Sequence, residues 1–78
     1  MNRGTAMQIK SKYGLVHVPS ERKCLAWAAA VRENRAAGLP SEHAGLQAAR
    51  SVFPYEAREL YVPEAHSVEE IIAGMEFE

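Results

Sequence analysis

The longest apolar run in this chain, residues 24–31, constrains its fold more than any other feature. The run is rich in alanine and has no Gly or Pro, which gives it a high helix propensity. Ser20 precedes it as a candidate N-cap, and Gly38 follows it as a candidate helix terminator. The sequence therefore predicts a helix over residues 21–37. Its inward face consists of Cys24, Trp27, Ala28 and Val31.

Two further helices are indicated by local signals. Ser41 is a candidate N-cap for a second helix that ends near Phe53, just before a proline. Only a short turn separates it from the first helix, so we expect an Ala-rich αα-hairpin. Ser67 and Glu70 have the spacing of a capping box, which predicts a third helix over residues 68–75.

The remaining segments favour extended structure. Residues 7–10 alternate apolar and polar side chains, residues 15–18 are rich in valine, and Gly14 between them suits a turn, so a short β-hairpin is predicted. Residues 59–62 are interpreted as a short third strand, although residues 54–62 are also compatible with a helical turn. The predicted fold class is α+β: a short β-hairpin, the αα-hairpin, a short third strand and a C-terminal helix. The alternative is an all-α bundle with extended termini.

With 78 residues, the chain is expected to form a single small globular domain over residues 6–78, after a disordered N-terminus at residues 1–5. A lone cysteine, Cys24, excludes an internal disulfide, and no segment resembles a signal peptide or a membrane span. We therefore expect a cytoplasmic protein, and its Ala- and Arg-rich composition is typical of a bacterial or phage genome. The predicted core is Leu25, Trp27, Val31, Val52, Phe53, Ile71 and Ile72.

No residue pattern indicates catalysis. Cys24 lies near a helix N-terminus beside two cations, which lowers a thiol pKa, but no histidine has a spacing that would supply a general base. His17, His43 and His66 lack the spacing of metal ligands, and no glycine-rich phosphate loop is present. The sequence predicts a non-enzymatic protein with no catalytic residue, no metal and no cofactor, in which Cys24 is a structural thiol.

Charge divides the chain into two unequal parts. Residues 1–50 carry eight Lys or Arg against three Glu, a net charge of +5, whereas residues 51–78 carry one Arg against seven Glu, a net charge of −6. Acidic surfaces steer basic partners, and aromatic side chains are enriched at interface centres. We therefore expect a small accessory or inhibitory factor that occupies the surface of a partner protein. The candidate protein-binding residues are Tyr61, Glu69, Glu70, Glu76 and Phe77.

The alternative function is a nucleic-acid-binding regulator. Residues 21–53 have the helix–turn–helix layout of many DNA-binding proteins. The exposed side of the second helix offers one fixed cation, however, whereas phosphate contacts normally need several. The candidate nucleic-acid-binding residues are Arg22, Lys23, Arg32, Arg35 and Arg50.

Overall fold

The computed structural model describes residues 3–55 and 67–76. Within these residues the protein is entirely helical, and no strand is present. The predicted α+β class is therefore wrong. The four described helices are α1 (Arg3–Tyr13), α2 (Glu21–Ala36), α3 (Ser41–Val52) and α4 (Val68–Glu76).

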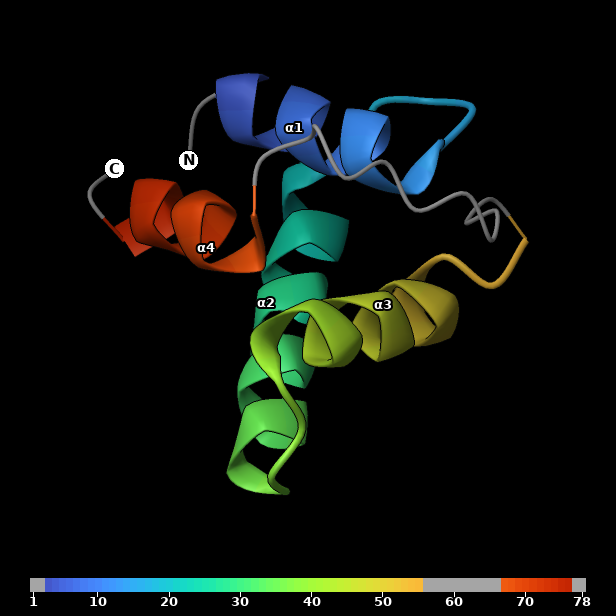
Figure 1. Ribbon diagram of the computed structural model, residues 1–78. Coiled ribbons are helices and arrows are strands. Elements are labelled where there is room, and N and C mark those ends of the chain that lie inside the picture. The colour runs from blue at the N-terminus through green and yellow to red at the C-terminus, as the bar shows by residue number, and fades with distance from the viewer. Residues whose placement is uncertain (1–2, 56–66, 77–78) are drawn as a thin grey trace.

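The helices are arranged around α2, which stands upright in Figure 1. α3 begins in front of α2 and runs to its right, α1 lies across the upper end of α2, and α4 lies to its left. α2 contacts α3 most extensively, and α1 and α4 contact each other as well as their neighbours. The first and last helices in the sequence are thus adjacent in space.

The predicted helices at residues 21–37, from Ser41 to Phe53 and at residues 68–75 are all present, within a residue of their predicted ends. Ser20 caps α2 as predicted, because its Oγ accepts a hydrogen bond of 3.3 Å from the Lys23 amide. Ser67 likewise accepts from the Glu70 amide at 3.2 Å. The N-cap of α3 is Pro40, however, and Ser41 is the first helical residue.

The predicted β-hairpin at residues 7–18 is replaced by α1 and a loop. Gly14 does adopt a positive φ, of 62°, but it terminates a helix where a hairpin turn was expected. The Leu15 amide donates to the Lys10 carbonyl at 3.0 Å, the six-to-one bond of a Schellman motif. Gly38, with φ 101°, ends α2 in the same way, with the Leu39 amide bonded to the Asn34 carbonyl.

The alternative of an all-α bundle with extended termini is closer, although its N-terminus is also helical. α1 begins at Arg3, inside the segment predicted to be disordered, and Thr5 is buried. The predicted third strand at residues 59–62 lies outside the described residues.

Among the described residues, fourteen apolar side chains form the core; they come from all four helices, from the loop after α1 and from Phe53 just after α3. Of the predicted core, Val52 and Ile72 are only partly buried and pack against its edge, and Leu25 is 52% exposed. Leu25 lies on the side of α2 opposite its buried face, so its prediction as a core residue is wrong. The other predicted members, Trp27, Val31, Phe53 and Ile71, are buried.

The α2–α3 contact is fixed by side chains of α2 that donate to backbone carbonyls of α3. The Trp27 indole nitrogen donates to the Gly45 carbonyl at 3.1 Å, and the Asn34 amide donates to the Ala44 carbonyl at 3.1 Å. A Cβ placed on Gly45 would lie 2.4 Å from Val68 Cγ2 and 2.5 Å from the Tyr13 hydroxyl oxygen. α3 therefore packs too closely against its neighbours to carry any side chain at position 45.

A buried lysine connects three helices. Lys12 of α1 is 1% exposed, and its Nζ lies 2.6 Å from Glu42 Oε1 of α3. The other carboxylate oxygen of Glu42 accepts a hydrogen bond of 2.9 Å from the Val68 amide at the start of α4. Burial of an ammonium group is costly unless a counter-ion and hydrogen bonds compensate it, and Glu42 supplies the counter-ion.

Candidate functional site

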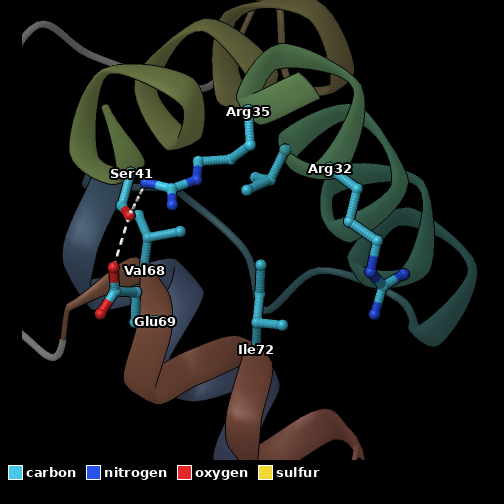
Figure 2. Close-up of a pocket in the computed structure, with 7 residues that line it drawn as sticks. Arg32, Arg35, Ser41, Val68, Glu69 and Ile72 are labelled. Atoms are coloured by element: carbon cyan, nitrogen blue, oxygen red, sulfur yellow. Dashed lines mark hydrogen bonds between the residues drawn. The ribbon is translucent and has the colours of Figure 1, made fainter. Parts of the chain in front are cut away.

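An open pocket of about 400 Å³ lies where α2, the first turn of α3 and α4 converge (Figure 2). Its floor is apolar and its rim is charged. The floor is formed by Val31 of α2 together with Val68 and Ile72 of α4. The rim carries Arg32 and Arg35 from α2, Ser41 from α3 and Glu69 from α4.

The pocket follows from the helical periodicity of α2 and α4. Val31 is the last buried residue of α2, and the exposed residue Arg32 follows it directly along the helix. Val68 and Ile72 are four residues apart, so they lie one turn from each other on α4 and face the pocket together. The apolar sides of the two helices therefore meet at the floor of the pocket, and their charged side chains lie at its rim.

A chain of hydrogen bonds crosses the mouth of the pocket. Arg35 Nη1 donates to Ser41 Oγ, and Ser41 Oγ donates to Glu69 Oε1 at 2.6 Å (Figure 2). The chain joins one side chain from each of three helices. Because these groups are exposed, their net contribution to stability is about 0–1 kcal/mol. This network therefore orients the rim more than it holds the fold together.

The predicted protein-binding residues fall partly on this pocket. Glu69 forms part of its rim, and Glu70 is exposed beside it on α4. Glu76 ends α4, and of this residue only the helical backbone is described. Tyr61 and Phe77 lie outside the described residues. The acidic surface proposed from the sequence is thus represented here by Glu69 and Glu70 alone, and Glu69 is hydrogen-bonded within the fold.

The predicted nucleic-acid-binding residues are spread over the surface. Arg22 and Lys23 lie in the first turn of α2, roughly 15 Å along the helix axis from Arg32 and Arg35 at 1.5 Å per residue. Lys23 Nζ lies over the Phe53 ring, 5.9 Å from its centroid. Arg50 is on α3. The fold brings only Arg32 and Arg35 together, on the pocket rim.

Cys24 lies inside the core and is fully buried. Burial raises the pKa of its thiol, and the negative charge of Glu21 raises this pKa further. The thiol is therefore protonated at neutral pH, the opposite of what nucleophilic catalysis needs. Its nearest polar contact is the Pro19 carbonyl, 3.9 Å from Sγ.

Two residues of structural importance, Lys12 and Glu42, were missed by sequence reasoning. Lys12 is spaced three residues from Ile9, on the buried side of α1, so helical periodicity would place it inside. A lysine at such a position ordinarily argues against a helix with that face buried. Its counter-ion, Glu42, lies in the first turn of the second helix of the αα-hairpin, thirty residues away, so no local pattern indicated the pair.

The exposed side of α2, away from its buried stripe, is a second surface of interest. Leu25, Ala26, Ala29 and Ala36 are all exposed there, and charged residues flank them. We refer to Arg22, Leu25, Ala26, Ala29 and Glu33 as the outer face of α2. This face therefore presents small apolar side chains and one leucine between an arginine and a glutamate.

In residues 3–55 and 67–76, no group of three or more His, Cys, Asp or Glu side chains is arranged to hold a metal ion. None of the helices in these two segments is long and apolar enough to cross a membrane. Comparisons with protein-family models, with curated proteins and with solved structures find no match to this chain.

Proposed function

We propose that this protein is a small, non-enzymatic, cytoplasmic accessory or inhibitory factor that binds a partner protein through the pocket between α2 and α4. The observation that carries this proposal is the composition of the pocket, an apolar floor with Arg32 and Arg35 on one side of the rim and Glu69 on the other. A volume of about 400 Å³ is near the lower end for ligand pockets, and it suits one or two side chains of a partner.

The two sides of the rim specify the partner's chemistry. Arg32 and Arg35 favour a carboxylate on one side of the inserted segment, because guanidinium groups bind carboxylates in bidentate geometry. Glu69, together with the exposed Glu70 beside the pocket, favours a basic residue on its other side. The partner segment therefore carries an apolar anchor residue between an acidic and a basic side chain. Buried apolar anchors of this type dominate the binding energy of small interfaces.

Site-specific photo-crosslinking tests this proposal. A photoreactive amino acid placed at Ala73, which is exposed on α4 one residue after Ile72, should capture a partner protein from a lysate of the native host. The same amino acid at Gln47, an exposed position on α3, is the matched control. Adding Ile72→Glu to the Ala73 probe should abolish capture, because it places a charge on the apolar floor.

Two results would contradict the proposal. The first is capture of the same protein from both probe positions, or despite Ile72→Glu, which would remove the pocket from the interface. The second is a crosslinked product that disappears on nuclease treatment, which would favour the nucleic-acid alternative. A circular dichroism spectrum of each variant establishes that a loss of capture is not a loss of fold.

A further inference from the structure

The outer face of α2 forms one continuous stripe on the longest helix of the described residues. Arg22, Leu25, Ala26, Ala29 and Glu33 follow the spacing of a single helical face, and every one of them is exposed. Leu25 is 52% exposed, so about half of its side-chain surface is accessible to a second molecule. The packing of α1, α3 and α4 leaves this face uncovered.

The outer face of α2 carries opposite charges at its two ends. Arg22 lies at its N-terminal end and Glu33 at its C-terminal end, eleven residues apart, or roughly 16 Å along the helix axis. Eleven residues are close to three full helical turns, so the two residues lie at nearly the same angle around the helix, between Ala29 and Ala26. An antiparallel second copy of α2 therefore brings Arg22 of each chain opposite Glu33 of the other. A parallel copy would place like charges together.

The small residues fit the same arrangement. A twofold axis that pairs Arg22 with Glu33 passes between positions 27 and 28, and the same axis pairs Ala26 with Ala29. Alanine opposite alanine at the centre allows helix axes to approach to about 8 Å. Leu25 then lies over Ala29 of the second chain, so a large side chain meets a small one.

The flank of α2 next to Leu25 carries a second charge pair, in which the order of the two signs along the helix is reversed. Glu21 and Arg32 are also eleven residues apart, with the acidic residue first, so the same antiparallel copy places them opposite each other. Arg32 additionally lines the pocket between α2 and α4, so it lies where the two surfaces adjoin. For that reason the variants that test the association change Arg22 and Glu33 alone.

We infer that the outer face of α2 binds a second copy of this chain in antiparallel orientation, as a twofold-symmetric dimer. A face that is complementary to its own reversed copy in charge order and in side-chain size is what an isologous interface requires. Complementarity to a different protein would not impose this reciprocity. One helix pair buries less area than the roughly 1,200 Å² of stable complexes, so the dimer is a weak, concentration-dependent one.

Sedimentation equilibrium with charge-swapped variants tests this inference. Wild-type protein, measured over a range of concentrations up to the millimolar, should show a monomer–dimer equilibrium. Arg22→Glu alone and Glu33→Arg alone should each weaken self-association roughly tenfold, because two symmetric ion pairs become repulsive. The chain carrying both changes should recover the wild-type equilibrium, since both pairs are restored with their signs reversed.

Mixing the two single variants gives the sharpest result. The Arg22→Glu chain offers two glutamates and the Glu33→Arg chain offers two arginines, so an equimolar mixture should form heterodimers more strongly than either variant self-associates alone. Gln47→Glu, on the exposed side of α3, is the matched control for an added negative charge and should leave the equilibrium unchanged. Thermal melts of each variant show that the fold is retained.

The inference is overturned if wild-type protein stays monomeric throughout this concentration range. It is equally overturned if the single variants dimerise as well as the wild type, or if mixing them restores nothing. Either of the last two results would assign self-association to another surface. The partner proposed for the pocket is not involved in any of these measurements, so their outcome is independent of that proposal.

Discussion

The packing around α3 and the packing between α1 and α4 are built differently. α3 meets α2 through two hydrogen bonds to its own backbone carbonyls, at Ala44 and Gly45, and position 45 has no room for a Cβ. α1 and α4 meet more loosely, since a Cβ on Gly74 of α4 would find its nearest neighbour, Thr5 Oγ1, at 4.0 Å.

The link between α1 and α4 also passes through α3. Lys12 and the Val68 amide do not contact each other directly in the described hydrogen bonds but share the two oxygens of Glu42. The contrast shows that α2 and α3, which are close in the sequence, are joined by hydrogen bonds from side chains of α2 to backbone carbonyls of α3. α1 and α4 contact each other loosely, and their hydrogen-bonded connection runs through a carboxylate that belongs to neither of them.

The largest expected effect is that of Trp27→Ala, because Trp27 belongs to both regions. Its indole donates to Gly45, and its ring lies 6.0 Å from that of Tyr13, centroid to centroid. Removing this fully buried side chain should lower the free energy of unfolding by about 3–5 kcal/mol, most of the stability of a domain of this size. Urea unfolding followed by circular dichroism measures it.

Leu25→Ala on the outer face of α2 is the matched control for this change. At low protein concentration, where self-association is negligible, it should cost less than about 1 kcal/mol, because Leu25 is half exposed. Equal losses for the two substitutions would mean that the inner and outer faces of α2 have been assigned wrongly.

Two glycine substitutions test directly whether α3 packs more closely against its neighbours than α4 packs against α1. Gly45→Ala should destabilise the protein by about 1–3 kcal/mol, because the new methyl group would overlap Val68 and the Tyr13 hydroxyl. Gly74→Ala should stabilise it by up to about 1 kcal/mol, since alanine favours the helix and meets nothing closer than 4.0 Å. Thermal melting of both variants checks the two signs, and the same sign for both would remove the contrast.

The Lys12–Glu42 pair should show a coupling energy of about 1 kcal/mol in a double-mutant cycle of Lys12→Met and Glu42→Gln. The buried position of Lys12 strengthens the interaction relative to a surface pair. Ser41→Ala, which breaks the exposed hydrogen-bond chain between Arg35 and Glu69, is the comparison. It should lower the free energy of unfolding by less than either Lys12→Met or Glu42→Gln alone. Strictly additive effects of Lys12→Met and Glu42→Gln would show that the pair does not join α1 to α3.

The smallest expected effect concerns the pH dependence contributed by Cys24. Its raised pKa keeps the thiol protonated in the folded state, whereas the unfolded thiol ionises near its ordinary pKa of about 8.5. The stability contributed by the neutral thiol is therefore complete below that pH and is lost as the pH rises toward the folded pKa. Urea unfolding between about pH 8 and 10 should show a steeper decline for wild type than for Cys24→Ala. Parallel declines would refute this assignment.

The parts of the fold that were predictable from sequence are those with local signals. Ser20, Gly38 and Ser67 each mark a helix end through bonds to residues within five positions, so α2 and α4 begin and end near where the sequence indicates. Such signals are complete within one short segment and do not depend on what packs against it.

α1 was mispredicted because its signal is not local. Four alternating residues at 7–10 are too few to separate a strand from a helix. Thr5, Ile9 and Lys12 form the buried side of this helix, but two of the three are polar, so the sequence does not show an apolar stripe. These polar side chains are buried only because residues distant in the sequence pack against them. Gly14 was correctly expected to adopt a positive φ, but that conformation serves a helix end as well as a hairpin.

The candidate pocket was predictable only in part, for the same reason. Arg32, Arg35 and Glu69 were each singled out from charge, but as members of separate and competing surfaces. Their meeting depends on α4 returning to α2 over thirty residues later, which no local pattern records.

The capping of α4 by Glu42 has a consequence for how this helix exists at all. A helix of nine residues is too short to persist in water alone, and the carboxylate that accepts from its first amide belongs to α3. α4 is therefore helical only when it is packed against the rest of the molecule, so it forms and packs in the same step. In hydrogen-exchange experiments the Val68 amide should then report the opening of α3 and α4 as a single cooperative unit, with no independent fraying of the last helix.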